Sequence, residues 1–248
     1  MKTRVVILGH RGMLGSMVKK YLESKSEFDV LVTEKRWPET EFKKEIQTSK
    51  CDYIINCIGA IHQKTKNFEV NYELPIWLSS LKCKVIHPGT DCESDSTDYG
   101  ISKKKAYDFI TEESTNTKII KCSIIGPEVY GYYGLFEWFC RSKKKQVYGW
   151  DCFFWNGITT LKWAEVAHNI INEWNDFQTV TIPHTKCISK YDLLLKIKNT
   201  FDKKIDVKRD SSIKEDKCLD GNYSVCDIEK QLSDMKYFCK HNNFLLSY

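Results

Sequence analysis

Short apolar runs alternate with longer amphipathic runs along the first half of the chain. The apolar runs predict strands at 4–8, 28–33, 53–58, 84–87 and 118–125, and the amphipathic runs predict helices at 13–23, 39–49, 68–81 and 99–111. The strands are rich in Val and Ile without polar alternation, which is typical of strands buried on both faces. The alternation therefore predicts an α/β fold, in which helices cover both faces of a doubly wound parallel sheet.

The pattern changes after about Gly126, where aromatic residues crowd together up to Trp155. Two further helices are predicted at 161–174 and 190–201, and the C-terminal end of the chain is the least readable part. No linker-like segment separates the two halves. We therefore expect a sheet domain over 1–126, with a smaller and mainly substrate-binding part over 127–248 packed directly on it.

The composition excludes several classes of protein. Hydrophobic residues make up 42% of the chain and charged residues 29%, and no apolar run approaches the roughly 18 residues that a membrane span needs. A net charge of +5 suits an anionic ligand but is too small to indicate nucleic-acid binding. The eleven cysteines stand singly without a CxxC pair, so we interpret them as reduced thiols of a cytoplasmic protein. Histidines lack metal-ligand spacing too, and no metal site is predicted.

A glycine loop joins the first strand to the first helix, with the sequence GHRGMLG from Gly9 to Gly15. Glycines at this spacing allow a tight turn and a close approach of the backbone to a pyrophosphate, which the helix N-terminus then faces. A glycine-rich turn without a ligand is the alternative, but the strand, the glycines and the helix together predict the dinucleotide site of a Rossmann domain. The predicted contacts are Gly9, Arg11, Gly12, Met13, Leu14 and Gly15.

The end of the second strand bears on the choice of cofactor. Glu34 stands near the spacing at which an acidic residue binds the adenosine ribose of NAD. Lys35 and Arg36 follow it, and Arg11 lies in the glycine loop. Three cations around one ribose favour a 2′-phosphate and hence NADP. NAD stays as the alternative, because Lys35 and Arg36 can equally be solvent-exposed residues at the end of the strand that bind no ligand.

The third strand ends in Asn56, Cys57 and Gly59, and a small residue there lets the cofactor pass. We therefore include these three residues among the predicted contacts of the cofactor. Asn71, on the following helix, is a candidate to brace this loop.

Tyr99 and Lys103 open the helix at 99–111, and their i, i+4 spacing puts them on one face. A free tyrosine has a pKa of about 10, and a neighbouring ammonium lowers it toward a value useful for proton transfer. Thr90, just after the fourth strand, is placed to hydrogen-bond a reacting carbonyl. A helix with a lysine-rich face is the alternative, but the position downstream of a dinucleotide loop favours catalysis. Lys103 also becomes a candidate to hold the nicotinamide ribose, so both Tyr99 and Lys103 count among the cofactor contacts.

These features resemble the extended short-chain dehydrogenase/reductases. The chain is most similar to the dTDP-4-dehydrorhamnose reductase type and to related reductases of nucleotide-linked 4-keto-6-deoxy sugars. Supporting segments are Asn56 to Gly59, Asn71 to Pro75, Thr90 to Cys92, Ser123 to Gly126, Asn156 to Thr160 and Ser189 to Leu194. The glycine loop also resembles that of GDP-fucose synthases, which use NADPH. The likeness is clear to about Trp174 and looser beyond it.

The resemblance implies NAD(P)H-dependent reduction of the C4 ketone of a UDP- or dTDP-linked 4-keto-6-deoxy sugar, in rhamnose-type deoxysugar biosynthesis. Tyr99 would donate the proton, Lys103 would tune Tyr99, and Thr90 would orient the carbonyl. Implied substrate contacts are Glu128, Trp150, Trp155, Thr159, Arg209 and Lys217, with a core or lid role left open for the aromatic residues. The nucleotide sugar is the expected partner, without nucleic acid or membrane, and a homodimer is left open.

The sequence departs from the family pattern in two places, and these departures keep other functions open. Eight residues separate Thr90 from Tyr99, where the family usually has a longer loop that lines the sugar pocket. Cys92 matches a cysteine that acts in C3 epimerisation in GDP-fucose synthases, but Glu128 stands where its His or Lys partner is expected, and an inert cysteine is the alternative. The other candidates are a different epimerase or dehydratase of the superfamily and a non-catalytic, cofactor-binding regulatory subunit.

Overall fold

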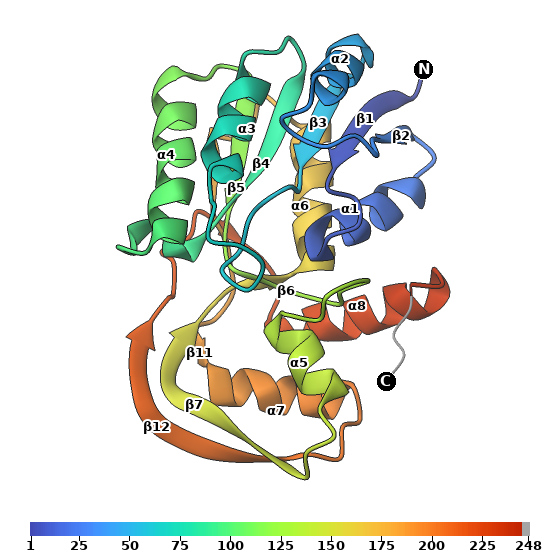
Figure 1. The fold of residues 1–248 in the computed structure, drawn as a ribbon. Coiled ribbons are helices and arrows are strands. Elements are labelled where there is room, and N and C mark those ends of the chain that lie inside the picture. The colour runs from blue at the N-terminus through green and yellow to red at the C-terminus, as the bar shows by residue number, and fades with distance from the viewer. Residues whose placement is uncertain (245–248) are drawn as a thin grey trace.

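Six parallel strands form the central sheet of the computed structural model, which describes residues 1–244 (Figure 1). The strands are β1 (Thr3–Leu8), β2 (Phe28–Val32), β3 (Tyr53–Asn56), β4 (Lys84–Gly89), β5 (Thr117–Lys121) and β9 (Val180–Thr181). Their order is β2-β1-β3-β4-β5-β9, and every neighbouring pair is parallel. The predicted doubly wound parallel sheet is therefore confirmed.

Both faces of the sheet are buried, and the pleat sends alternate residues to opposite sides. Val5 and Ile7 of β1 join one apolar cluster, whereas Val6 and Leu8 join the other. Helices α1 (Met13–Glu23) and α6 (Thr160–Asn172) cover the first face, and α2 (Thr40–Thr48), α3 (Val70–Ser79) and α4 (Asp98–Glu113) cover the second. This double burial explains why the strands read as unbroken apolar runs.

One predicted strand divides in the structure. The apolar run at 118–125 gives β5, which ends at Lys121, and then a short β6 (Ile124–Ile125) that leaves the sheet. β6 pairs with β8 (Ile158–Thr159), which lies far along the chain. An apolar run shows burial but not the partner strand, so the break was not visible in the sequence.

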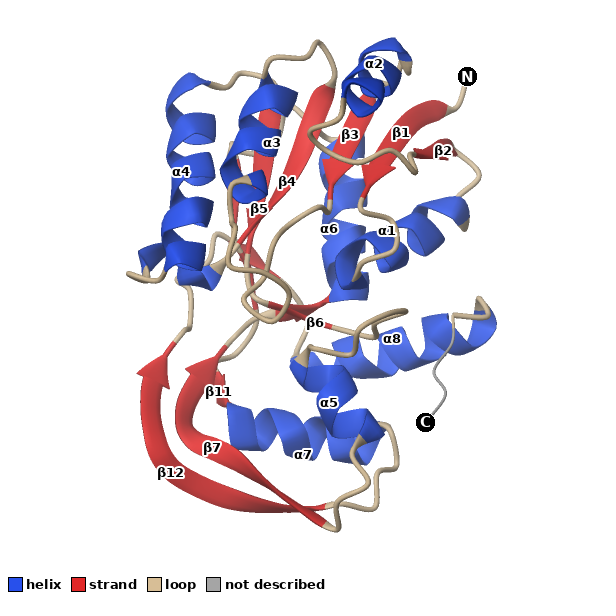
Figure 2. Cartoon of the chain, viewed as in Figure 1, coloured by secondary structure: helices blue, strands red, loops and turns tan. Residues whose placement is uncertain are grey.

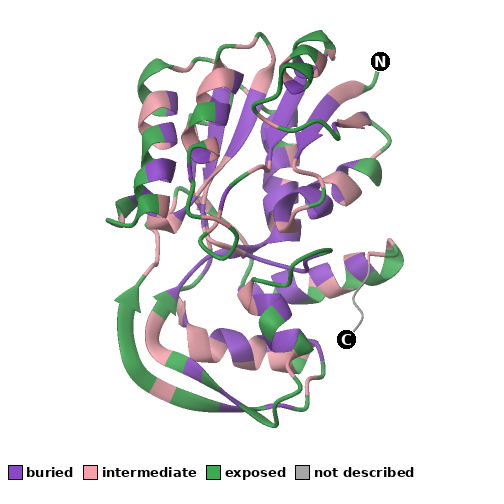
Figure 3. Cartoon of the chain, in the orientation of Figure 1, coloured by how far each residue is buried: buried purple, intermediate pink, exposed green. Residues whose placement is uncertain are grey.

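The second part of the molecule lies beyond the carboxyl ends of the sheet strands (Figure 2). Its elements are α5 (Leu135–Arg141), β7 (Gln146–Trp155), β10 (Pro183–His184), β11 (Ile188–Ser189), α7 (Lys190–Thr200), β12 (Asp206–Asp216), β13 (Tyr223–Ser224) and α8 (Ile228–His241). β7 pairs with β12 in parallel and with β11 antiparallel. The sequence did not reveal β12, because most of this strand is exposed and charged and carries no apolar signal (Figure 3).

One continuous core joins the two parts. Its members include Ile7 of the sheet, Trp163 of α6, Trp155 of β7, Leu193 of α7 and Met235 of α8. The expected direct packing of the C-terminal part on the sheet is thus present. The proposed division at 126/127 is less sharp, because α6 and β9 return to the sheet and complete its layers. The last residues of the predicted part 127–248 lie outside the described residues.

The strand order fixes where a ligand can bind. β2 lies on one side of β1 and β3 on the other, so the direction of winding reverses at β1. In open α/β sheets the crevice outside the carboxyl ends at such a reversal is the binding site. Figure 2 shows the arrowheads of the sheet strands pointing toward the second part. Among residues 1–244, no helix combines the length and the apolar character needed to cross a membrane.

The shared core makes a testable difference between two tryptophans of β7. Trp155 is fully buried, whereas Trp150 is 41% exposed. We expect Trp155→Ala to lower the free energy of unfolding by about 3–5 kcal/mol, because it leaves a large cavity. Trp150→Ala should lower it by about 1 kcal/mol or less, since mainly a ring contact is lost. Urea unfolding measures both, and equal losses would contradict the shared core.

Candidate active site

The glycine loop forms a cradle that fits a pyrophosphate. Gly9 adopts a positive φ of 73°, and a Cβ on Gly15 would lie 2.2 Å from the Gly9 carbonyl oxygen, so the turn requires glycine at both positions. Gly12 is the N-cap of α1, and no side chain of the described residues caps this helix end. A Cβ on Gly12 would meet only the Gly9 oxygen, at 3.4 Å. The first N–H groups of α1 therefore face space that an anion can enter.

The predicted adenosine end is a cavity of about 330 Å³ between the glycine loop and the end of β2. Glu34 lies in it, with its Oε2 2.7 Å from Arg11 Nη2 and its Oε1 3.3 Å from His10 Nε2. Lys35 and Arg36 line the same cavity and are exposed. The structure thus brings the predicted cations together around Glu34, whose charge Arg11 offsets.

The end of β3 differs from the sequence prediction. Asn56 is fully buried and its side chain shapes the loop: its Oδ1 accepts a hydrogen bond from the Ile58 N–H at 3.0 Å. Its contact with a cofactor stays a prediction. Burial raises the pKa of the half-buried Cys57 thiol, so it stays protonated. Gly59 is exposed, as a passing cofactor requires. The side chain of Leu14 lies in the core, which leaves only its backbone to face a ligand.

Asn71 braces this loop, as its position predicted. Its Oδ1 accepts a hydrogen bond from the Ala60 N–H at 2.7 Å, and its Nδ2 donates to the Ala60 carbonyl at 3.1 Å. The same Nδ2 lies 3.1 Å from the Oγ of Ser102, which stands between Tyr99 and Lys103 on α4. One amide therefore ties the loop after β3 to the helix that carries the tyrosine and the lysine.

Thr90 holds the short connection after β4. It is the N-cap of a 3₁₀ turn, η1 (Asp91–Ser94), and its Oγ1 accepts a hydrogen bond from the Cys92 N–H at 3.2 Å and donates to Asp91 Oδ1 at 3.0 Å. The Thr90 N–H donates in turn to Glu93 Oε1 at 3.0 Å. This reciprocal capping box fixes the Thr90 hydroxyl at the carboxyl end of the sheet.

Tyr99 reaches Thr90 because α4 begins directly against η1. A Cβ on Gly100 would lie 2.4 Å from the Cys92 carbonyl oxygen, so only glycine permits this approach. Tyr99 lies near Thr90, whose hydroxyl acts against the rise of the tyrosine pKa. The Tyr99 ring lies 5.6 Å from the His62 ring. The eight-residue connection therefore still delivers Tyr99 to the strand ends.

The pKa of Tyr99 differs from the sequence prediction. Burial and then the nearby Cys92 raise the pKa of Tyr99 to about 12. The Lys103 Nζ is held elsewhere: it donates to the Pro88 carbonyl at 2.6 Å and lies 3.2 Å from His87 Nε2. Burial also lowers the pKa of Lys103 to about 8, so the lysine is mostly an ammonium ion at about pH 7 and loses its proton as the pH rises through about 8. The net pKa of Tyr99 is therefore raised, where the sequence predicted a lowered value.

The environment of Cys92 disfavours a thiolate. Its Sγ lies 3.6 Å from Asp91 Oδ1, and burial followed by this carboxylate raises the pKa of the thiol to about 12. Glu128 is no partner for it: the Glu128 carboxylate is bound by the backbone N–H groups of Tyr133, at 3.1 Å, and Gly134. We correct the assignment of Glu128 to substrate binding, because it organises the loop that leads to α5.

Three further substrate contacts are also corrected. Trp155 belongs to the core, and Thr159 is fully buried as the N-cap of α6, where its Oγ1 accepts from the Lys162 N–H at 3.2 Å. Lys217 is paired with Asp95 and, at 3.0 Å, with Glu215. Burial works to lower the pKa of Lys217, but these hydrogen bonds outweigh it and raise the pKa.

Trp150 and Arg209 stay predictions. The Trp150 ring stacks on Phe153 at 5.6 Å and is partly exposed. Arg209 is exposed on β12, with its guanidinium 4.5 Å from the Tyr191 ring and 3.6 Å from Asp151.

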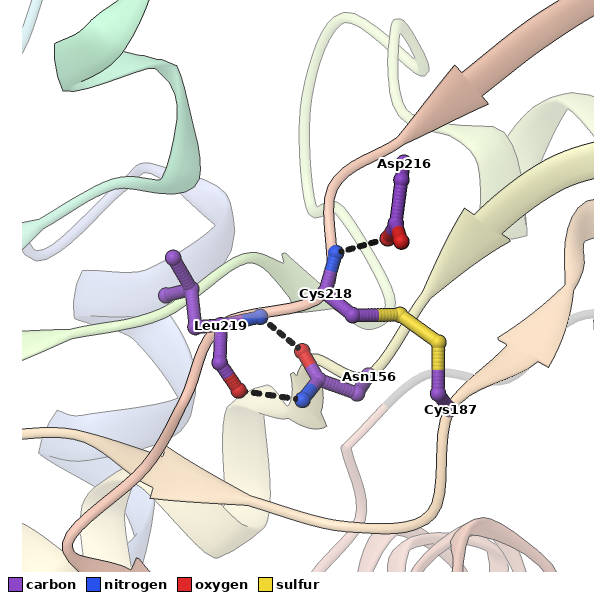
Figure 4. The surroundings of a disulfide bond; sticks show 5 residues. All are labelled: Asn156, Cys187, Asp216, Cys218 and Leu219. Atoms are coloured by element: carbon purple, nitrogen blue, oxygen red, sulfur yellow. Dashed lines mark hydrogen bonds between the residues drawn. A yellow bond between two sulfur atoms is a disulfide. The ribbon is translucent and has the colours of Figure 1, made fainter.

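A disulfide corrects the interpretation that all cysteines are reduced. Cys187, just before β11, is bonded to Cys218, which follows β12 (Figure 4). The adjacent Asn156 side chain pairs with both backbone groups of Leu219, at 2.8 and 2.9 Å. The other nine cysteines are free, and all eleven lie among the described residues. Since Lys217 pairs with Asp95, the segment from 217 to 219 connects η1 to the second part.

The disulfide also bears on metal binding. Both sulfur atoms lie near a carboxylate of Asp216, with all three ligand atoms within 4.8 Å of one another. Sulfur atoms bonded to each other have no thiolate to offer a metal ion. In this state the two cysteines form a covalent link between two segments.

Two residues beside the site escaped the sequence analysis. His87 is a polar residue in a buried strand, three positions before Thr90, and that placement was the available signal. Lys190 begins α7, with its Nζ 5.2 Å from the rings of Phe153 and Trp155. Burial lowers the pKa of Lys190, while the nearby Asp91 carboxylate opposes that shift. Only the tertiary structure brings this lysine to η1.

The fold and the site define an α/β domain with a glycine loop at the end of its first strand and a second part over its strand ends. Comparisons place this arrangement among known structures. No protein-family model matches the chain, and no curated protein sequence does. A dTDP-4-dehydrorhamnose reductase from Bacillus anthracis, in complex with NADP, superposes with a TM-score of 0.82 at 16% identity, over 96% of this chain and 99% of that one.

Two further structures show the breadth of the likeness. The GDP-mannoheptose C4 reductase from Campylobacter jejuni with NADP bound has a TM-score of 0.69 at 13% identity, over 96% and 98% of the chains. A dTDP-glucose 4,6-dehydratase from B. anthracis with NAD has 0.75 at 12%, over 97% of each. The chain therefore shares the fold of these two reductases and this dehydratase, and the fold that the sequence resemblance implied is confirmed.

The raised pKa of Cys92 predicts a slow reaction with electrophiles, because the thiolate is the nucleophile. At about pH 7.5 we expect iodoacetamide to label Cys92 at least about tenfold more slowly than the exposed Cys226. Peptide mass spectrometry over time measures both rates. Equal labelling would contradict the protonated state assigned to Cys92.

Proposed function

We propose that the protein reduces the C4 ketone of a nucleotide-linked 4-keto-6-deoxy sugar with NADPH. The observation that carries this proposal is the convergence of Thr90, Tyr99 and Lys103 at the end of β4, on the sheet edge that also bears the glycine loop. The superposed reductases from B. anthracis and C. jejuni both hold NADP, which supports the cofactor and the class of substrate. UDP and dTDP are the proposed nucleotides.

The residues present fit the cofactor. Backbone N–H groups at Gly12 to Leu14 would bind the pyrophosphate, and Arg11, Lys35 and Arg36 would surround a 2′-phosphate. Lys103 would meet the nicotinamide ribose. When bound, NADPH supplies the hydride that the carbonyl carbon takes up.

The side chains of this chain supply the proton. With its pKa raised to about 12, the Tyr99 hydroxyl is fully protonated at neutral pH and can donate to the oxygen of the reacting carbonyl as that oxygen gains negative charge. The capping box holds Thr90 beside Tyr99, where its hydroxyl orients the same oxygen. Lys103 in its ammonium form stabilises the tyrosinate that remains.

The second part of the molecule would bind the nucleotide sugar. Lys190 replaces Lys217 as the proposed contact for the diphosphate, because Lys217 is already paired with Asp95. Trp150 is the proposed partner of the base. The family usually has a longer loop after the strand-end threonine, and that loop lines the sugar pocket. In this chain the ion pair of Lys217 and Asp95 covers the side of η1 instead. Residues of the second part would therefore line part of the sugar pocket.

Other predictions keep their status or are not pursued. A cytoplasmic location and a homodimer stay predictions. C3 epimerisation is not part of the proposal, since neither the protonated Cys92 nor the occupied Glu128 supports it.

Removal of the Tyr99 hydroxyl tests the reductase directly. We expect Tyr99→Phe to lower kcat for NADPH oxidation with the keto sugar by about 10²–10⁴-fold, the usual contribution of a general acid. Tyr107→Phe on the same helix is the matched control and should stay within about twofold. NADPH fluorescence checks that both variants still bind the cofactor.

The substrate assay uses UDP-, dTDP- and GDP-linked 4-keto-6-deoxy sugars, with products identified by NMR. A C4 alcohol from the UDP- or dTDP-linked sugar is the expected product. If the wild-type protein binds NADPH but reduces none of the panel, or if Tyr99→Phe is as active as the parent, the proposal is wrong.

The assignment of NADP depends on the charges around Glu34. Glu34→Gln removes a carboxylate beside the proposed 2′-phosphate and releases Arg11, so we expect the preference for NADPH over NADH to rise by about tenfold. Glu39→Gln, an exposed acidic residue outside the cavity, is the control. Ratios of kcat/KM for the two cofactors decide the point, and a shift toward NADH contradicts it.

A further inference from the structure

A chain of buried polar groups connects Lys103 to His87 and Asn56. Lys103 Nζ lies 3.2 Å from His87 Nε2, and His87 Nδ1 lies 3.2 Å from Asn56 Nδ2. The three side chains come from α4, β4 and β3, and each is at most 7% exposed. Buried polar groups must satisfy one another, so their proton positions are coupled.

The backbone fixes the direction of this chain. The Ile58 N–H can only donate, and it points at Asn56 Oδ1, so this oxygen is the acceptor and Nδ2 faces His87. Because Asn56 Nδ2 can only donate, His87 Nδ1 must accept. Burial and the nearby Lys103 lower the pKa of His87 well below its usual value, so the ring is neutral and carries its one proton on Nε2.

The proton on Nε2 then points at Lys103. An ammonium ion has no lone pair to receive it, whereas an amine has one. The amine would accept from His87 Nε2, donate to the Pro88 carbonyl at 2.6 Å and keep one N–H for a further partner. An ammonium would require the other tautomer of His87, which would set two donors against each other at Asn56.

We propose that Asn56 and His87 are positioning residues for Lys103, which hold its Nζ at the end of β4 and favour the uncharged amine over the ammonium ion. His87 acts through Lys103 and touches no reacting atom. Lys103 thereby becomes a group that exchanges its proton near neutral pH. A lysine in water would keep that proton to far higher pH.

Other charged groups near Lys103 act in the opposite direction. Glu93 of η1 raises the lysine pKa, although Lys121 at the end of β5 pairs with Glu93 Oε2 at 2.8 Å and reduces that effect. Tyr99, one turn earlier on α4, keeps its proton at neutral pH and adds no charge. Burial outweighs Glu93, and the pKa of Lys103 falls to about 8.

The kinetic consequence rests on the proposed reductase function. The ammonium form of Lys103 assists Tyr99, so activity should be present below the lysine pKa and fall as the pH rises through about 8. A substitution that places a hydrogen-bond acceptor opposite the Lys103 Nζ stabilises the ammonium form of the lysine. The alkaline limb of the pH profile then moves to higher pH.

The first test reads the tautomer of His87 in the protein alone, without cofactor or substrate. Long-range ¹H–¹⁵N spectra at about pH 9, one unit above the Lys103 pKa, should show the Nε2–H form in the wild type. In Asn56→Asp one carboxylate oxygen takes the Ile58 N–H and the other takes Nδ1–H, so His87 should change to the Nδ1–H form. His87→Gln assigns the signal. An Nδ1–H tautomer in the wild type, or no change in Asn56→Asp, overturns the proposal.

The second test is the pH dependence of kcat. Asn56→Asp should move the alkaline limb up by about 1 pH unit, the lower end of the effect of a nearby carboxylate. His87→Gln should also move it up, because its amide oxygen can accept from the ammonium, and it serves if Asn56→Asp does not fold. His168→Gln, a half-buried histidine of α6 outside the site, is the matched control and should leave the limb in place.

The two tests separate two kinds of failure. If the alkaline limb of the kcat profile stays in place in both Asn56→Asp and His87→Gln, the positioning role is contradicted. A protein that reduces no keto sugar contradicts the proposed function instead, and the tautomer measurement then still decides the inference.

Discussion

A parallel sheet buried on both faces leaves its strand ends as the place for polar chemistry, and the site follows from that constraint. Alternate residues of β1, such as Ile7 and Leu8, enter two different apolar clusters, so neither face of the strand is free for polar groups. The glycine loop, Asn56 and Thr90 all stand where β1, β3 and β4 end. Since parallel strands end at one edge, residues far apart in the chain meet there.

The same edge is completed by close packing of the segment after β4. Gly100 lets α4 begin against the Cys92 carbonyl, and the capping box of Thr90 fixes the turn between them. The short connection therefore still brings Tyr99 to the strand ends. Lys217, held near the disulfide of Cys218, reaches across from the second part to Asp95 and takes up the side of this turn.

Burial at the junction of the two parts sets the protonation of the site. It raises the pKa values of Tyr99 and Cys92 to about 12 and lowers that of Lys103 to about 8. Low polarity disfavours every charged form, so the tyrosine and the cysteine keep their protons and the lysine releases its own more easily. The same physical cause thus supports a proton donor at Tyr99 and argues against a thiolate base at Cys92.

The sequence by itself determined the features that depend on local periodicity and spacing. The parallel sheet, the bounds of α1, the glycine loop and the placement of Thr90, Tyr99 and Lys103 followed from apolar runs, glycine spacing and an i, i+4 pair. Each of these patterns involves residues close together in the chain, whose geometry is fixed by the helix or strand that contains them. Asn71 was predicted in the same way, because it stands on the helix that directly follows the loop after β3.

Only the tertiary structure decided which distant residues meet and how deeply they are buried. Trp155 and Thr159 became core and cap residues, and Cys187 met Cys218 across 31 positions. The charged strand β12 carried no apolar signal because it is exposed, and Lys190 reached η1 from another half of the chain. Burial and partner choice are properties of the packed molecule: a residue type shows what a side chain can do, and its neighbours decide its charge and its hydrogen bonds.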